Sequence, residues 1–219
     1  MNKPDPSSAF AHVTDWVFDL DNTLYPPAAR LFDQIEEKMR AFMVKELGVD
    51  QDEANHLRKN YWEVHGTTLS GLMKEHGIQP EQFLIDVHDI TFDVLQPAPD
   101  LAALIKNLPG RSIVYTNGTK PYAEQVLKAR GLDGIFDDVY GIEHANYLPK
   151  PQRAAFDIVF GLDGLPQQTA AMFEDEARNL EVPRDMGLRT VHVAPEPDHA
   201  DYVDFHTDDL TDFLRQISR

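Results

Sequence analysis

The chain has 219 residues, 42% of them hydrophobic, and its 37 Asp and Glu against 20 Lys and Arg give a formal net charge of −17. The apolar share is enough for a folded core and argues against a disordered chain, and the length favours one large domain or one domain with an insert. The negative charge argues against a nucleic acid polymer or an anionic membrane as partner, because both would be repelled at long range.

The sequence contains no cysteine, which excludes disulfides, thiolate catalysis and cysteine metal sites. No apolar run approaches the roughly 18 residues that a membrane-spanning helix needs, and the first residues lack the apolar core of a secretory signal. We therefore expect a cytoplasmic protein that is not attached to a membrane. The sequence leaves the oligomeric state open.

The first half of the chain predicts one strand and a block of helices. Residues 1–11 resemble a loose tail, and the β-branched and aromatic residues of 12–20 predict a short strand. Apolar residues at three- and four-residue spacing then predict helices; these cover 31–47, 51–64, 68–76 and 80–94. The segment 96–100 (QPAPD) is interpreted as a linker that ends this block.

Strand and helix patterns alternate through the second half of the chain. Strands are expected over 112–115, 138–141, 169–173 and 190–193, and helices over 121–130, 151–160, 177–186 and 208–217. Such alternation predicts right-handed βαβ units and a parallel sheet. We predict an α/β fold with a Rossmann-like parallel sheet from residues 12–25 and 97–219, and an inserted all-helical domain over residues 26–96.

Two aspartates follow the first predicted strand. Asp19 and Asp21 share one face if the backbone stays extended, and two like charges so close repel unless a cation lies between them. In an arbitrary chain a DxDxT segment is more often a simple turn with an Asx cap. An apolar strand before the pair and a helical block after it favour a functional role here.

The segment FDLDNTLYP at 18–26 closely resembles motif I of the haloacid dehalogenase superfamily, whose pattern is DxDx(T/V). The resemblance implies that Asp19 is a nucleophile that forms an aspartyl-phosphate. It implies that Asp21 protonates the leaving oxygen and then deprotonates the hydrolytic water, and that Thr23 helps to hold Asp21. Because the dehalogenase branch lacks the second carboxylate, Asp21 favours phosphoryl transfer.

Two further segments resemble motifs II and III of the same superfamily. The Thr116 hydroxyl and the Asn117 N–H would donate hydrogen bonds to phosphate oxygens, and Gly118 would let the backbone approach the ligand. Lys150, between two prolines, would neutralise Asp19 and the incoming phosphate. Taken alone, the first segment is an ordinary turn sequence and the second an ordinary surface lysine.

The segment MFEDEARN at 172–179 resembles motif IV, which completes a Mg²⁺ site. We assign Asp175 as a metal ligand, together with the Asp19 carboxylate and the backbone carbonyl of Asp21, because Mg²⁺ prefers oxygen ligands. Glu174 would bind through water or balance charge, and Asn179 would orient Asp175. The EDxxxN pattern departs from the commoner forms and leaves open which acidic residue is the closer ligand.

The helical block lies where this superfamily places a C1-type cap, which excludes water and contacts the leaving group. The stretch 61–72 (YWEVHGTTLSGL) resembles the pyrimidine 5′-nucleotidase-like branch. That resemblance implies nucleoside monophosphates such as UMP or CMP as substrates, with Tyr61, Trp62 and His65 as candidate contacts to base or sugar. The alternative for Tyr61 and Trp62 is a place in the core of the cap.

The resemblance therefore implies a magnesium-dependent phosphomonoesterase that acts on a small-molecule phosphate ester. A sugar phosphomutase, or a phosphatase of sugar phosphates or pyridoxal phosphate, would use the same motifs with a different cap. A catalytically silent interaction protein is the third alternative, and the intact acidic pairs argue against it.

Overall fold

A six-stranded parallel sheet forms the centre of the computed structural model, which describes residues 5–218. Its strands are β1 (Asp15–Phe18), β2 (Arg111–Tyr115), β3 (Asp138–Tyr140), β4 (Ala170–Glu174), β5 (Arg189–Val193) and β6 (Phe205–Thr207). They lie in the order β3-β2-β1-β4-β5-β6. Strands β2 and β3 thus lie on one side of β1, and β4, β5 and β6 lie on the other. Ligands of open parallel sheets bind where the strand order reverses in this way.

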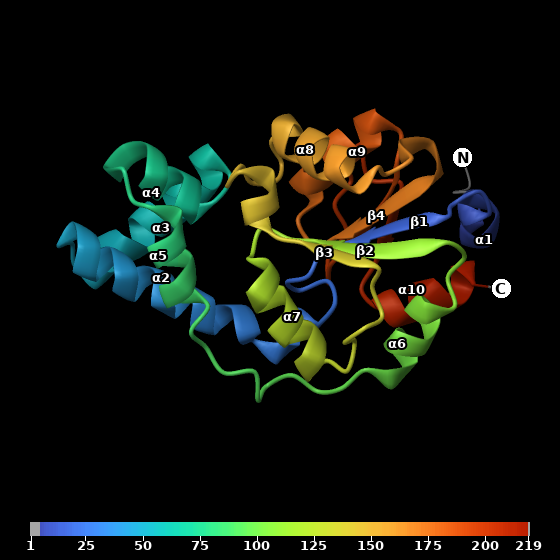
Figure 1. Ribbon diagram of the computed structural model, residues 1–219, viewed down its shortest axis with the longest axis horizontal. Helices are drawn as coiled ribbons and strands as arrows, with labels where there is room; N and C mark the ends of the chain where they lie inside the picture. Colours follow the sequence, from blue (N-terminus) through green and yellow to red (C-terminus); the bar gives the residue numbers. More distant parts are fainter. Residues whose placement is uncertain (1–4, 219) are drawn as a thin grey trace.

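Both faces of the sheet are covered by helices (Figure 1). Helices α8 (Arg153–Asp163) and α9 (Glu181–Met186) lie over one face. Helices α6 (Pro99–Lys106), α7 (Lys120–Ala129) and α10 (Leu210–Ile217) lie over the other. Since successive side chains of a strand point to opposite faces, Val17 packs in the cluster under α8, while Trp16 and Phe18 pack in the larger cluster on the opposite face.

Four helices between β1 and β2 project to one side of the sheet (Figure 1). They are α2 (Leu31–Leu47), α3 (Gln51–His65), α4 (Thr68–His76) and α5 (Pro80–Val87). Asp50 and Thr67 cap α3 and α4, and Gly48 ends α2 in the left-handed conformation that glycine adopts without strain. The predicted α/β fold with an inserted helical block is confirmed. The domain limits 12–25 and 97–219 against 26–96 stay a prediction.

The predicted helix over 80–94 is wrong beyond Val87. The chain continues as an irregular segment with turns, from which Ile90 and Phe92 still pack against the core. The Gln34 side chain bonds both backbone groups of Thr91, at 3.0 and 3.2 Å, and so replaces the hydrogen bonds of a helix. A tertiary contact therefore satisfies the backbone N–H and C=O of Thr91 without helical structure.

The predicted loose tail is also wrong within the described residues. A helix, α1 (Pro6–Phe10), begins after Asp5, which caps it, and Phe10 is only 3% exposed. The Phe10 ring packs against Trp16 and Phe213. Residues 1–4 of that tail lie outside the described residues. Helix α6 and strand β6 were not predicted either, and α6 begins inside the expected linker.

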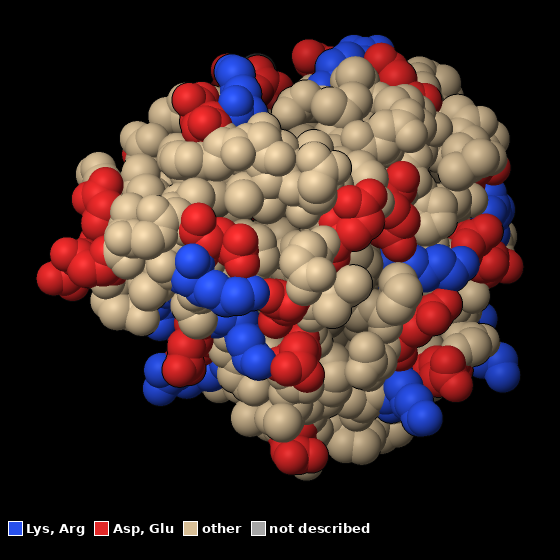
Figure 2. Space-filling model, turned by 60° about the vertical axis from the view of Figure 1, so that its left-hand side comes forward, with Lys and Arg blue, Asp and Glu red and all other residues tan. Residues whose placement is uncertain are grey.

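On the face shown in Figure 2, lysine and arginine side chains lie among acidic ones and do not gather into one basic patch. Within residues 5–218, no helix has both the length and the apolarity that a membrane crossing requires.

Candidate active site

The predicted chemical residues converge at the carboxyl edge of the sheet. Phe18 of β1 is in register with Val114 of β2 and with Phe173 of β4, so the residues that follow all three strands emerge together. A pocket of about 530 Å³ opens there, between the sheet and the inserted helices. Its lining includes the predicted residues Asp19, Asp21, Thr116, Asn117, Gly118, Lys150, Glu174 and Asp175.

Lys150 is buried and lies among the carboxylates. Its ammonium donates to Asp19 Oδ1 and Glu174 Oε1, both at 2.7 Å, and to the Tyr115 carbonyl at 3.1 Å. These acceptors use all three donors of the ammonium. Burial lowers the pKa of Lys150, but the two carboxylates outweigh it and raise that pKa above its ordinary value. The two carboxylates therefore favour the charged form of the buried Lys150.

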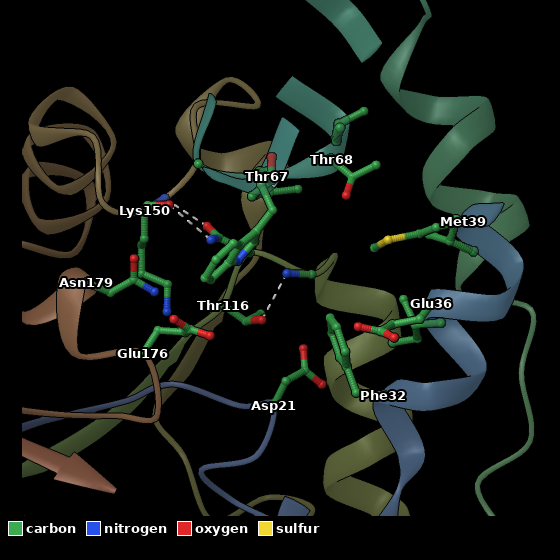
Figure 3. A pocket seen from close by; sticks show the side chains of 18 of the residues that line it. Asp21, Phe32, Glu36, Met39, Thr67, Thr68, Thr116, Lys150, Glu176 and Asn179 are labelled. Carbon is green, nitrogen blue, oxygen red and sulfur yellow. Dashed lines mark hydrogen bonds between the residues drawn. The ribbon is translucent and has the colours of Figure 1, made fainter. Parts of the chain in front are cut away.

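The backbone of Lys150 is held by the segment after β2. The Asn117 side chain accepts from the Lys150 N–H at 2.9 Å and donates to the Lys150 carbonyl at 3.3 Å (Figure 3). Thr116 Oγ1 accepts from the Gly118 N–H at 2.9 Å. The TNG turn thus positions the lysine as well as forming part of the pocket lining, a function of the Asn117 side chain that the sequence did not indicate.

Asp19 is 5% exposed and accepts a second hydrogen bond, from the Thr23 hydroxyl to Oδ2 at 3.2 Å. The prediction that Thr23 holds Asp21 is wrong, because the turn after β1 directs the hydroxyl back to Asp19. Burial raises the pKa of Asp19 to about 8, although Lys150 opposes this effect, while Glu174 and Asp21 add to it. Ionised Asp19 therefore depends on nearby positive charge.

Asp21 is held by two tyrosines that the sequence analysis missed. The hydroxyls of Tyr25 and Tyr122 both donate to Oδ1, at 2.7 and 2.6 Å. The carboxylate of Asp21 projects into the pocket (Figure 3). Burial raises the pKa of Asp21, and the two phenol hydrogen bonds oppose that shift. Tyr25 belongs to the NTLYP segment, which is the one signal that pointed to it.

The two acidic residues after β4 have different surroundings. Glu174, 1% exposed, accepts from Lys150 and from Asn179 Nδ2 at 2.7 Å each, and from the Glu176 N–H at 2.7 Å. Asp175 accepts from Asn22 Nδ2 at 3.2 Å. The prediction that Asn179 orients Asp175 is therefore wrong, since Asn179 bonds Glu174.

Asp19, Glu174 and Asp175 each offer a carboxylate oxygen, and these oxygens lie within 4.8 Å of one another. With all three carboxylates ionised, the one ammonium of Lys150 would leave two net negative charges in this cluster. Burial, followed by the charges of Glu174 and Asp19, raises the pKa of Asp175 well above its ordinary value. A divalent cation that prefers oxygen would reverse these shifts, so the donor set fits Mg²⁺.

The inserted helices form the opposite wall of the pocket. Tyr61 and His65, two of the expected substrate contacts, are not among the described residues that line it. Tyr61 is 6% exposed and its hydroxyl pairs with His76 Nε2 at 2.6 Å, while His65 Nε2 lies 3.3 Å from Glu75. Trp62, the third expected contact, does line the pocket.

Comparison with known proteins places the chain in a family. Residues 17–187 match the family model described as "haloacid dehalogenase-like hydrolase". The chain is 28% identical over 205 residues to Phosphate metabolism protein 8 of Saccharomyces cerevisiae, covering 84% of this chain and 62% of that protein. It thus spans about three fifths of the length of this relative.

Two solved structures share the fold. CbbY from Rhodobacter sphaeroides, in complex with phosphate, has a TM-score of 0.67 at 18% identity and covers 94% of this chain and 100% of its own. A phosphatase of the same superfamily from Thermococcus onnurineus has a TM-score of 0.64 at 19% identity and covers 94% of this chain and 97% of its own. With the family model matching more than half of its residues, the chain belongs to the haloacid dehalogenase-like hydrolases.

Proposed function

We propose that this protein is a magnesium-dependent phosphomonoesterase. The observation that carries the proposal is the buried Lys150 ammonium, 2.7 Å from both Asp19 and Glu174, at the end of a pocket that also contains Asp21. This arrangement combines a nucleophile, a second carboxylate for proton transfer and a fixed positive charge. Phosphoryl transfer depends mainly on such positioning and charge neutralisation.

Mg²⁺ would be held by the carboxylates of Asp19 and Asp175 and the backbone carbonyl of Asp21. When bound, it would neutralise charge on the transferred phosphoryl group. Asp175 is favoured over Glu174 as the closer ligand, because both Glu174 oxygens already accept hydrogen bonds from protein donors. His192 Nε2 donates to the Asp175 carbonyl at 2.8 Å and limits movement of this loop.

In the first step an Asp19 oxygen attacks phosphorus, the ester P–O bond breaks, and an aspartyl-phosphate forms. Asp21 gives its proton to the departing alkoxide oxygen. Burial raises the pKa of Asp21, which favours the protonated form that this step uses. Lys150 and Thr116 line the same pocket as Asp19 and would stabilise the phosphoryl oxygens there.

In the second step water attacks the aspartyl-phosphate, the bond between phosphorus and Asp19 breaks, and inorganic phosphate leaves. Asp21 takes the proton of that water and so returns to its starting state. The two phenol hydrogen bonds to Oδ1 fix Asp21 while leaving Oδ2 directed to these proton transfers. The inserted helices limit the access of water to the first step.

The proposed substrate is a nucleoside 5′-monophosphate, with a pyrimidine base. The resemblance of 61–72 to pyrimidine 5′-nucleotidases supports it, and a pocket of about 530 Å³ is of a size for such a ligand. A phosphomutase on the same scaffold remains the alternative; it would transfer the phosphoryl group to a second sugar phosphate and would not release inorganic phosphate.

The test is release of inorganic phosphate from a panel of nucleotides, sugar phosphates and pyridoxal phosphate with Mg²⁺. We expect Asp19→Asn to abolish turnover, and Asp33→Asn, an exposed residue paired with Arg30, to leave it unchanged. With p-nitrophenyl phosphate, whose leaving group needs no proton, Asp21→Asn should accumulate a phosphoenzyme detectable by mass spectrometry. Turnover by Asp19→Asn would refute the assignment of Asp19 as the nucleophile.

A further inference from the structure

An ion pair lies in the wall that the inserted helices contribute to the pocket. Arg58 of α3 donates through Nη1 to Glu36 Oε1 of α2 at 2.8 Å. The side chains are 12% and 35% exposed, respectively. Both residues line the pocket together with Asp19 and Lys150. Figure 3 places Glu36 on α2, across the pocket from Lys150.

The wall around this pair also contains Lys59 and Glu63 of α3. Its apolar part includes Phe32, Ile35, Met39, Leu69, Phe83 and Val87. Withdrawing most of the Arg58 side chain from water in such surroundings is costly, and a well-packed apolar residue in its place is often neutral or more stabilising. Packing of α2 against α3 therefore gives no reason for a charged pair at this position. A charged pair that lines a pocket points to a ligand.

Nearby hydroxyls on this wall are already engaged. Thr67 Oγ1 donates to Ser70 Oγ and accepts from the Ser70 N–H, both at 3.1 Å. Thr68 Oγ1 donates to the Arg58 carbonyl at 3.2 Å. A ligand rich in hydroxyls would find few free partners among these groups, whereas a flat apolar ligand would be covered by the surrounding side chains.

We infer that the Glu36–Arg58 pair recognises the base of a nucleoside 5′-monophosphate, an assignment that rests on the proposed function. A carboxylate only accepts hydrogen bonds and a guanidinium only donates them. The pair therefore matches a ligand edge that carries a donor beside an acceptor. A nucleobase has such an edge on a flat body, whereas a sugar phosphate without a base offers hydroxyls but no flat body.

The test compares kcat/KM for UMP and CMP with kcat/KM for ribose 5-phosphate, which is the same ester without the base. In the double variant Glu36→Leu/Arg58→Met, we expect the ratio of nucleotide to ribose 5-phosphate to fall about 10- to 100-fold, the effect of losing one or two charge-assisted hydrogen bonds. Lys38→Met, which removes the exposed ion pair of α2 with Asp89, is the matched control and should leave the ratio unchanged.

A second variant covers the case in which the double variant does not fold. Glu36→Gln keeps the size of the side chain but adds an amide donor, so the relative kcat/KM for CMP and UMP should change. The inference would be overturned if the double variant kept the wild-type ratio of nucleotide to ribose 5-phosphate and Glu36→Gln kept the wild-type ratio of CMP to UMP. A wild-type preference for ribose 5-phosphate would also overturn it. Either result would leave the proposed phosphatase activity intact. Failure of the wild type to hydrolyse any of the three esters would overturn the proposed function as well.

Discussion

The guanidinium of Arg178 lies 3.8 Å from the centre of the Trp62 ring, which brings the segment after β4 into contact with the inserted helix α3. Arg178 also donates to the carbonyls of Trp62 and Gly66, at 3.0 and 3.1 Å. Carbonyls in the last turn of a helix have no partner within the helix, and a cation there is favourable. One side chain thus joins the inserted helices to the loop that contains Asp175.

We predict that Arg178→Ala will loosen this contact and expose Trp62. The chain has two tryptophans, of which Trp16 is 2% exposed and Trp62 is 39% exposed, so acrylamide quenching of fluorescence reports mainly on Trp62. Quenching should increase, because the variant loses the Arg178 guanidinium that lies over the Trp62 ring. An exposed cation–π contact of this kind contributes about 0.5–1 kcal/mol. Arg153→Ala, which breaks an exposed pair on α8, is the control. Equal quenching in both variants would contradict the prediction.

Replacing the buried cation Lys150 should destabilise the folded protein as well as inactivate it. Lys150→Met leaves Asp19 and Glu174 without their positive partner, and breaking a buried ion pair in this way costs about 3–5 kcal/mol. Denaturant unfolding measures the loss. The double variant Lys150→Met/Glu174→Gln should regain part of the free energy of unfolding but no activity. Additive losses in the double variant would show that the two residues are not coupled.

Mg²⁺ should stabilise the folded protein through Asp175. A ligand at 100 times its dissociation constant adds about 2.7 kcal/mol to the free energy of unfolding, so the melting temperature should rise with Mg²⁺ and fall again on adding EDTA. In Asp175→Asn the rise should be much smaller, because one carboxylate of the three-residue cluster is lost. Asp198→Asn, outside that cluster, is the comparison. An equal rise in both variants would remove Asp175 from the site.

His88 should make the protein less stable in mild acid. Its ring stacks on Tyr122 at 4.3 Å, its Nδ1 pairs with the Thr119 hydroxyl at 3.2 Å, and burial lowers its pKa to about 4. Between about pH 6.5 and 4 the unfolded state binds the extra proton, so stability falls as pH falls through this window.

The variant His88→Phe keeps a ring against Tyr122 but cannot titrate. From pH 7 to pH 4 the wild type should lose up to about 3 kcal/mol more of its unfolding free energy than the variant does. Urea unfolding at each pH measures both curves. Parallel curves would mean that His88 titrates alike in the folded and unfolded chains.

The local patterns of the sequence determined the alternation of strands and helices, the inserted helical block and the position of chemical residues after β1, β2 and β4. These features depend on residue spacing along a single segment, and parallel strands necessarily bring their carboxyl ends to one edge. The residues Asp19, Thr116, Lys150 and Asp175 therefore line one pocket, as predicted. Helices α2 and α4 even have the predicted bounds.

Only the tertiary structure decided which partner each of these groups has. Thr23 bonds Asp19, Asn179 bonds Glu174 and Tyr122 bonds Asp21, and no periodicity encodes these choices. The same holds for the five-residue helix α1, whose Phe10 is ordered by aromatic rings distant in the sequence. Hydrogen bonds and packing of this kind depend on the relative orientation of segments, which is defined once the whole chain has folded.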